Sequence, residues 1–268
     1  MCIKTSAFWL NNIGGNMFNY NSIKKTAKGF EESFYEGAFY NMQTQDSKHL
    51  SLILQRLNLS DGKKILDLGT GSGYLAFPLA SQNQNCEVIG LDIVKNTIQN
   101  NNLKASQQKI KNLKFLSYDG LKFPFDDGYF DIIVTRYAIH HFPDIDFCFK
   151  ELSRILKNGG QLYISDPTPN KEDNVEFIDK YMQIKDDGHI KCYFETELLK
   201  IANNSGFEKE FTDFTEIRFP RKYPDKYFEL MNKTEKRILD LYKIGIKNNE
   251  IIISEDVLNI SLKKININ

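Results

Sequence analysis

The chain has 268 residues, 41% of them hydrophobic, and it carries 35 basic and 35 acidic residues. This length and hydrophobic content predict one large α/β domain with a full core. The balanced charge argues against a nucleic-acid partner, because long contacts with phosphate backbones require an excess of positive charge. The four cysteines are scattered and lack the spacing of a disulfide framework, which is typical of proteins in a reducing cytoplasm. The sequence contains no run of about twenty apolar residues, so no membrane span is predicted.

Residues 1–42 are predicted to form an N-terminal arm or lid, and residues 43–268 the main domain. The first segment is rich in Asn, Gly, Phe and Tyr and shows no clear helical or strand period. Apolar residues at helical spacing between His49 and Leu57 then predict a helix that ends before the Asp61-Gly62 turn.

Between residues 63 and 166, short apolar runs alternate with longer amphipathic segments, which is the pattern of a parallel sheet built from βαβ units. Asn158-Gly159-Gly160 is predicted to end the last helix of this region. The predicted strands cover residues 64–68, 87–92, 113–118, 130–135 and 161–165, and the predicted helices cover 74–81, 95–107 and 144–156.

After Asp166 the pattern is less regular, and the elements are predicted from short apolar runs and turn residues. They are helices over 175–184 and 195–203, a strand over 207–217, a helical insertion over 218–245, and a hairpin or final strand pair over 250–265. Together the elements predict an α/β fold with a doubly wound, mostly parallel sheet.

The strongest motif is Asp67-Leu68-Gly69-Thr70-Gly71-Ser72-Gly73, in which a predicted strand runs into a glycine-rich turn. Glycines adopt backbone angles that side chains forbid, and they let a ligand lie against the main chain. Dinucleotide-binding folds use this arrangement with the spacing GxGxxG, whereas here the third glycine comes one residue early. Taken alone, the motif is equally consistent with an ordinary tight turn.

Acidic residues also follow the next two predicted strands. Asp92, followed by Ile93, ends the second strand, a position from which a carboxylate accepts hydrogen bonds from the ribose hydroxyls of a nucleoside. Asp119 precedes Gly120 after the third strand. Each acid has a structural alternative, Asp92 as the cap of the following helix and Asp119 as a turn residue. Three acids in order at three strand ends favour a cofactor site.

The series continues with Phe123-Pro124-Phe125-Asp126-Asp127-Gly128 and Thr135-Arg136-Tyr137-Ala138. Over residues 45–166 the chain resembles the class I S-adenosylmethionine-dependent methyltransferases, and in particular the branch of the ubiquinone and menaquinone C-methyltransferases and related small-molecule enzymes. The resemblance implies a seven-stranded Rossmann-like methyltransferase sheet, S-adenosylmethionine as the cofactor and a small-molecule methyl acceptor. The cofactor residues that it implies are Asp67, Gly69, Thr70, Gly71, Gly73, Asp92, Ile93, Asp119, Gly120, Arg136 and Tyr137, and we add Tyr20 and Tyr40 of the arm, because a ring face attracts the sulfonium.

Three histidines are candidates for removing a proton from the acceptor. His140 and His141 follow the fourth predicted strand, beside the expected methyl site, and His189 lies in a turn between the later helices. The structural alternatives are a histidine that holds the loop by a local hydrogen bond and, for His189, an exposed turn residue. No Cys or His cluster has metal-ligand spacing, so no metal site is predicted.

Two other functions stay open at this point. A nicotinamide-dependent oxidoreductase also uses a glycine turn and an acid after the second strand, and a non-catalytic nucleoside-binding module keeps the same fold. Thr135-Arg136-Tyr137-Ala138 lacks the acid, prolines and aromatic of enzymes that methylate nucleic-acid bases. We therefore expect a cytoplasmic enzyme that acts on a small-molecule acceptor and has no nucleic-acid partner. For its assembly we consider a homodimer.

Overall fold

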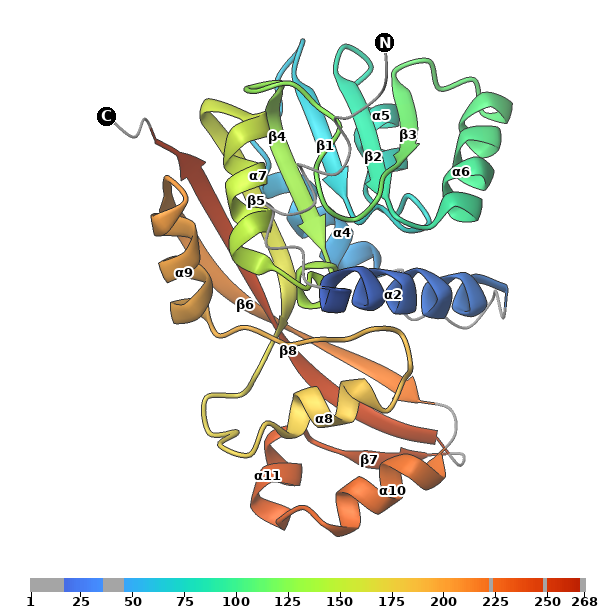
Figure 1. The fold of residues 1–268 in the computed structure, drawn as a ribbon, viewed down its shortest axis with the longest axis vertical. Helices are drawn as coiled ribbons and strands as arrows, with labels where there is room; N and C mark the ends of the chain where they lie inside the picture. Colours follow the sequence, from blue (N-terminus) through green and yellow to red (C-terminus); the bar gives the residue numbers. More distant parts are fainter. Residues whose placement is uncertain (1–16, 36–45, 222–223, 248–249, 266–268) are drawn as a thin grey trace, which may run out of the picture.

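A computed structural model describes residues 17–35, 46–221, 224–247 and 250–265 (Figure 1). The helices are α2 (Met17–Tyr35), α4 (Ser47–Arg56), α5 (Ala76–Gln82), α6 (Lys95–Gln107), η1 (Ile139–His141), α7 (Ile145–Ile155), α8 (Phe177–Gln183), α9 (Glu195–Asn204), α10 (Pro224–Asn232) and α11 (Lys236–Leu241). The strands are β1 (Lys64–Leu68), β2 (Glu87–Asp92), β3 (Leu113–Ser117), β4 (Phe130–Arg136), β5 (Leu156–Thr168), β6 (Phe207–Arg221), β7 (Gly245–Lys247) and β8 (Glu250–Lys264). No described helix combines the length and the apolar character needed to cross a bilayer.

All described strands belong to one sheet, with the order β3-β2-β1-β4-β5-β8-β6 and with β7 paired to β8. The first five strands of this order are parallel, and β8 is antiparallel to both β5 and β6. The doubly wound, mostly parallel sheet is thereby confirmed. It contains eight strands rather than the predicted seven, because the short β7 forms directly after the helical insertion and pairs with β8.

Helices cover both faces of the parallel part of the sheet. Phe149 of α7 and Leu198 of α9 belong to the core on one face, and Ile53 of α4, Leu79 of α5 and Ile98 of α6 belong to the core on the other. Strands that are covered on both sides read as continuous apolar runs, and β1 and β2 are buried along nearly all of their lengths. This explains why their predicted bounds agree with the structure.

The segment predicted as an N-terminal arm or lid contains a helix, although its sequence shows no clear helical period. α2 lies across the end of the sheet at which the parallel strands finish (Figure 1). Its inward side chains, Ile23, Thr26 and Phe30, form a narrow stripe among Asn, Lys and Glu residues, so the helical period is weak in the sequence.

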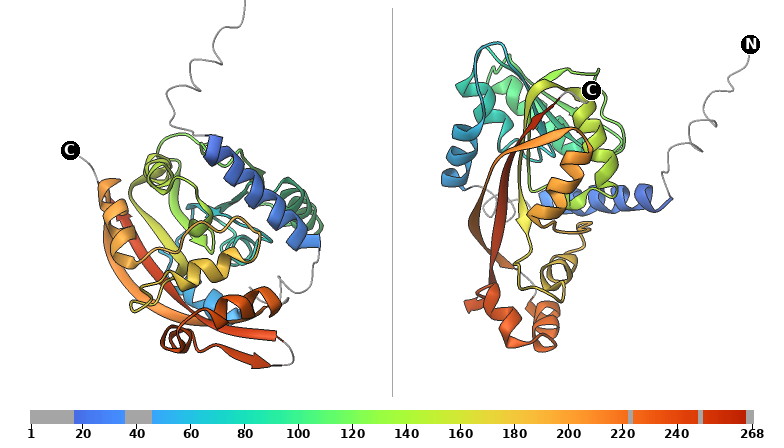
Figure 2. Two further views of the ribbon diagram at one scale, coloured as in Figure 1. Left: turned by 60° about the horizontal axis from the view of Figure 1, so that its bottom comes forward. Right: turned by 90° about the vertical axis from the view of Figure 1, so that its left-hand side faces the viewer.

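The chain end also differs from the prediction of a hairpin over 250–265. β8 is a single strand of 15 residues that pairs with β5 along one edge and with β6 along the other. Figure 2 shows β6 and β8 running together from the main body into a C-terminal lobe, which comprises α8, α10, α11 and β7. Tyr181, Tyr227, Ile238 and Tyr242 belong to the core of this lobe.

A smaller correction concerns the predicted helix stop at Asn158-Gly159-Gly160. α7 ends earlier, at Ile155, and β5 begins at Leu156, so the glycines lie within the strand. The pairing of β4 with β5 shifts register beside Phe130, and Gly159 adopts a positive φ of 74°. These glycines therefore belong to an irregularity of β5 rather than to a helix cap.

Candidate active site

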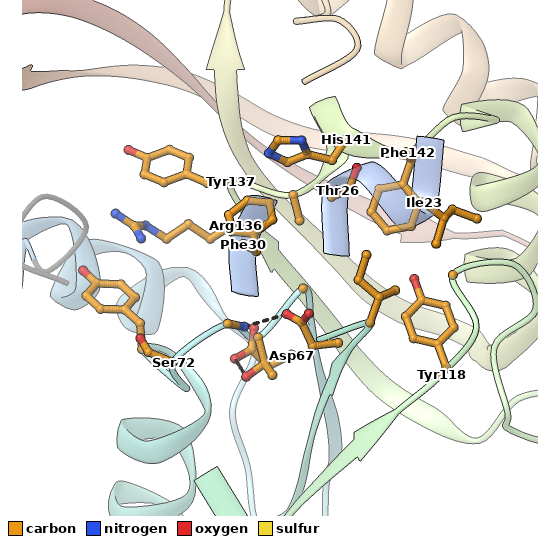
Figure 3. A pocket seen from close by; sticks show the side chains of 18 of the residues that line it. Ile23, Thr26, Phe30, Asp67, Ser72, Tyr118, Arg136, Tyr137, His141 and Phe142 are labelled. Carbon is orange, nitrogen blue, oxygen red and sulfur yellow. Dashed lines mark hydrogen bonds between the residues drawn. The ribbon is translucent and has the colours of Figure 1, made fainter. Parts of the chain in front are cut away.

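A pocket lies at the carboxyl ends of β1, β2 and β4, beneath α2 (Figure 3). Open α/β sheets bind ligands at this end, where the loops after neighbouring strands meet. The predicted site residues that line the pocket are Asp67, Gly69, Thr70, Gly71, Asp92, Ile93, Gly120, Arg136, Tyr137 and His141. The lining residues that were not predicted are Ile23, Thr26, Phe30, Ser72, Tyr74, Leu75, Tyr118, Ala138, Phe142 and Pro143.

The glycine-rich turn needs its glycines for both conformation and space. Gly69, Gly71 and Gly73 have positive φ angles of 70°, 49° and 79°. A Cβ on Gly69 would lie 2.5 Å from the Cβ of Ala138, and one on Gly73 would lie 2.6 Å from the ring of Phe77. Gly73 thus serves the packing of α5 and does not line the pocket, whereas Gly69 and Gly71 bring the main chain to its wall.

Asp67 stabilises the glycine-rich turn by two hydrogen bonds. Its Oδ2 accepts hydrogen bonds from the Thr70 hydroxyl at 2.7 Å and from the Ala76 amide at 3.1 Å. The side chain is almost completely buried, and this burial raises the pKa of Asp67 to about 7 in spite of the two hydrogen bonds.

Asp92 connects the second strand to the same turn. One carboxylate oxygen accepts the Gly71 amide at 2.9 Å, and the other accepts the Val94 amide at 3.0 Å. The carboxylate thus holds the backbone just before α6, whose N-cap is Val94 rather than Asp92, and it lines the pocket as well. Burial raises the pKa of Asp92 above its ordinary value.

Asp119 occupies a different environment from the other two acids. It is exposed, it accepts the Leu121 amide at 2.9 Å, and it is absent from the pocket lining. Its neighbours Tyr118 and Gly120 line the pocket instead. The turn interpretation describes Asp119 in this structure.

The last residue of β4, Arg136, supplies a fixed positive charge. The guanidinium of Arg136 lies over the rings of Tyr74, at 4.3 Å, and Tyr137, at 4.0 Å. Its Nε donates to Nδ1 of His49 at 3.4 Å, and burial together with the Arg136 charge lowers the pKa of His49 to about 4, so this histidine is a neutral acceptor. Tyr137 adopts a positive φ of 54°, which is unusual for an aromatic residue and typical of functional loops.

Asp166, near the end of β5, holds the loop that follows β4. Its carboxylate accepts the amides of Ala138, Ile139 and His140 at 2.9, 3.3 and 3.2 Å, and the Nδ1 of His140 at 2.8 Å. Burial by itself lowers the pKa of His140, but the Asp166 carboxylate outweighs burial and raises it. His140 and Asp166 are buried behind the pocket wall rather than in it.

Of the three predicted histidines, His141 lines the pocket. Its ring and that of Phe30 pack in a T-shaped arrangement, with their centroids 5.0 Å apart. Its Nδ1 is buried and has no hydrogen-bond partner among the described residues. Burial and the neighbouring His140, whose ring centroid is 4.1 Å away, lower the pKa of His141 well below its ordinary value. A neutral imidazole therefore faces the pocket.

His189 is buried, which corrects the alternative that it is an exposed turn residue. Its Nε2 contacts Asp179 at 2.8 Å, and it does not line the pocket. The ligand atoms of Asp179, His189 and Cys192 lie within 4.8 Å of one another, although the sequence spacing did not indicate such a group. Asp179 already accepts both His189 and the Cys192 amide, so internal hydrogen bonds explain this cluster and we assign no metal to it.

α2 docks on the turn that precedes His189. A Cβ on Gly188 would lie 2.1 Å from the Thr26 hydroxyl, and one on Gly29 would lie 2.5 Å from the carbonyl oxygen of Asp186. Two glycines thus allow the helix and the turn to touch, and Lys25 adds an exposed ion pair with Asp186 at 2.7 Å. This contact places α2 over the pocket.

Of the two tyrosines predicted to cover the cofactor, the structure describes Tyr20, which does not line the pocket. Tyr20 is 53% exposed and is absent from the lining, and Tyr40 lies outside the described residues. Phe30 takes the place expected of an aromatic lid residue. Its spacing from Ile23 and Thr26 is the signal that would have identified the inward face of α2.

A family model described as a methyltransferase domain matches residues 59–235, more than half of the chain. The chain belongs to this methyltransferase family. It is 30% identical over 179 residues to YcgJ of Bacillus subtilis, an uncharacterized methyltransferase, in a match that covers 65% of this chain and 66% of the relative. It is 34% identical over 110 residues to the demethylmenaquinone methyltransferase of Lactococcus lactis, covering 41% of this chain and 44% of that enzyme.

The solved structure of YcgJ matches this methyltransferase with a TM-score of 0.73 and 21% identity, covering 82% of this chain and all of the other. This likeness concerns the fold. The segments of this chain that align with the two curated relatives named above span less than two thirds of the length of each relative. The predicted family, and its branch near the menaquinone methyltransferases, are confirmed by these comparisons.

Proposed function

We propose that the chain transfers a methyl group from S-adenosylmethionine to a small-molecule acceptor. The observation that carries this proposal is that the glycine turn, Asp92 and the neutral His141 line one pocket in a chain of the methyltransferase family. When bound, S-adenosylmethionine supplies an activated methyl group on a sulfonium, so the protein needs only to hold the acceptor in line and to exclude water.

The residues of the wall fit this cofactor. Gly69 and Gly71 expose the main chain where side chains would clash or be strained, so a ligand can lie against it. Each oxygen of Asp92 accepts one amide and keeps further lone pairs, which we assign to the two ribose hydroxyls. We assign the Arg136 guanidinium, which lies over two aromatic rings, to the carboxylate of the cofactor's methionine portion.

The remaining assignments follow the pocket wall. We assign Ile93 and Gly120 to the adenine, and Thr70 and the backbone at Tyr137 to the methionine portion. Gly73 supports the turn by packing, and Asp119 receives no contact with the cofactor in this proposal.

α2 provides the means of excluding water. It covers the pocket through Ile23, Thr26 and Phe30, and it rests on the turn at Gly188. A lid of this kind separates the reacting groups from solvent while they are aligned.

The two alternatives from the sequence receive no support from the comparisons, since the matched family and the named relatives are methyltransferases. A cytoplasmic location, the absence of a nucleic-acid partner and a homodimeric state stay parts of the proposal. The equal numbers of acidic and basic residues support the second of these.

Calorimetric titration with S-adenosylhomocysteine, beside NAD, tests the proposal. We expect binding of S-adenosylhomocysteine alone, with a loss of about tenfold or more in Asp92→Asn, because an amide cannot accept all the hydrogen bonds of the carboxylate. Asp119→Asn is the matched control and should bind as the natural protein does. Far-UV circular dichroism checks that both variants are folded, and preference for NAD, or no binding of either compound, contradicts the proposal.

A further inference from the structure

His49, in the first turn of α4, is a buried histidine that the sequence did not indicate as a site residue. It does not line the pocket, yet its Nδ1 accepts the Nε–H group of Arg136 at 3.4 Å. Its ring centroid lies 6.0 Å from that of Tyr137, one of the two rings beside the guanidinium. The inference that follows rests on the proposed function, in which Arg136 receives the carboxylate of the cofactor.

The hydrogen bonds of His49 determine which ring nitrogen carries the proton. The Nε group of Arg136 only donates, so Nδ1 of His49 is an acceptor and the proton is on Nε2. Nε2 contacts Oδ1 of Asn259 at 3.3 Å and Oγ of Ser165 at 3.0 Å. The Ser165 hydroxyl donates to the same Oδ1 at 2.8 Å, so both oxygens can accept the Nε2 proton. The other tautomer would set an N–H group of His49 against that of Arg136.

The partners of His49 lie in one row across the sheet. Arg136 of β4 is paired with Ser165 of β5, and Ser165 is paired with Asn259 of β8. Ser165 and Asn259 are completely buried. Buried polar groups that hydrogen bond to one another are held rigidly, because a displacement would leave one of them unsatisfied. The imidazole therefore has a fixed position from which to hold the guanidinium.

The start of α4 also holds one of the rings beside Arg136. The Tyr74 hydroxyl donates to the carbonyl oxygen of Asp46, the N-cap residue of α4. The Asp46 carboxylate accepts the amides of Lys48 and His49 at 2.8 and 3.2 Å, which closes the first turn of the helix. One capped turn thus fixes both the Tyr74 ring, 4.3 Å from the guanidinium, and the imidazole that accepts its Nε–H group.

His49 is suited to hold a cofactor-binding arginine because its imidazole is uncharged. Burial and the charge of Arg136 both lower the pKa of His49, so the ring stays neutral beside the cation. A carboxylate in the same place would form an ion pair with the guanidinium and compete with the carboxylate of the cofactor. The neutral imidazole orients the guanidinium without reducing its attraction for an anion.

We propose that His49 is a positioning residue for the cofactor, and that its Nδ1 holds the Arg136 guanidinium in the orientation that receives the carboxylate of S-adenosylmethionine. His49 contacts neither the methyl group nor the acceptor in this proposal, and no bond is made or broken at its imidazole. Its effect is therefore confined to the amino-acid end of the cofactor. Ligands that carry this carboxylate depend on His49, and ligands that lack it do not.

Titration with S-adenosylhomocysteine and with 5′-methylthioadenosine tests the proposal. The second compound has the same nucleoside and a thioether, but it lacks the amino-acid portion. His49→Phe should weaken binding of S-adenosylhomocysteine by about tenfold, the effect of one hydrogen bond to a charged group, and should leave binding of 5′-methylthioadenosine unchanged. Arg136→Met should show the same selective loss, and the double variant should lose no more than Arg136→Met does.

Two conservative variants separate the positioning of Arg136 from support of the fold around α4. The side-chain oxygen of asparagine reaches the place of Nδ1, and the side-chain nitrogen of glutamine reaches that of Nε2. His49→Asn should therefore keep most of the preference for S-adenosylhomocysteine. His49→Gln, which keeps only the contact with Asn259, should lose the preference as His49→Phe does. The opposite order of the two variants indicates a structural role and overturns the proposal.

The outcomes distinguish this proposal from the methyltransferase function itself. Failure of the natural protein to bind S-adenosylhomocysteine contradicts the function. Binding by the natural protein, together with equal weakening of the two compounds in His49→Phe or additive losses in the double variant, overturns the role of His49 alone. Far-UV circular dichroism checks the fold of each variant, and binding of 5′-methylthioadenosine checks its nucleoside site.

Discussion

The carboxylate of Asp166 and the imidazole of His140 are joined by a 2.8 Å hydrogen bond beneath the pocket wall. The same carboxylate accepts three consecutive amides of the loop that follows β4. One residue of β5 therefore determines both the path of this loop and the charge of the histidine beside His141.

Asp166→Asn should change the titration of both neighbouring histidines. In the natural protein we expect the pKa of His140 above 6.5 and that of His141 well below it. Without the carboxylate, burial dominates and the pKa of His140 should fall below 6.5, while the pKa of His141 rises because the adjacent positive charge is lost. Nuclear magnetic resonance titration of ¹⁵N-labelled histidines measures both, and an unchanged His140 would argue against the electrostatic role of Asp166.

Gly188→Ala should loosen the docking of α2. The new Cβ would lie 2.1 Å from the Thr26 hydroxyl, whereas Gly62, with a similar φ of 76° against 79°, has nothing within 4 Å. Gly62→Ala is thus a matched control that carries the same backbone strain, about 1 kcal/mol, without the clash. We expect the α2 amides to exchange hydrogen about tenfold faster in Gly188→Ala only. Equal exchange in the two variants contradicts the contact.

Phe30→Ala should weaken binding of S-adenosylhomocysteine by about tenfold, because it removes an aromatic wall of the pocket. Tyr20→Ala should leave the affinity unchanged, since Tyr20 is 53% exposed on the same helix and does not line the pocket. Calorimetry distinguishes the two variants. An effect of Tyr20→Ala as large as that of Phe30→Ala would restore the tyrosine to the lid role that the sequence suggested.

Asp67→Asn should alter how stability depends on pH. Burial raises the pKa of Asp67 from 3.8 to about 7, so the folded protein keeps this proton in a range where the unfolded chain has released it. The raised pKa of Asp67 therefore adds most to the free energy of unfolding below about pH 4, and this stabilisation falls as the pH rises to about 7. The difference in unfolding free energy between the natural protein and Asp67→Asn, from urea denaturation without cofactor, should fall across this range. A difference that rises with pH contradicts the raised pKa.

Local patterns in the sequence were sufficient for the parallel sheet. β1 and β2 have the bounds that their apolar runs predicted, because strands buried on both faces are marked by uninterrupted hydrophobic residues. The GxGxG spacing and the position of Asp92 likewise placed residues in the pocket wall, since both lie directly at strand ends. The sequence by itself thus determined the fold class, the family and the end of the sheet where the pocket lies.

Contacts between distant segments decided the rest. The inward face of α2 is recognisable only against the turn at Gly188, and the single strand β8 depends on pairing with β5 and β6 at once. Which histidine faces the pocket was also beyond local pattern, because His140 and His141 are adjacent in the chain and only Asp166, 26 residues after His140, draws one of them behind the wall. Long-range pairing of buried polar groups, which leaves no periodic signal in a sequence, made that choice.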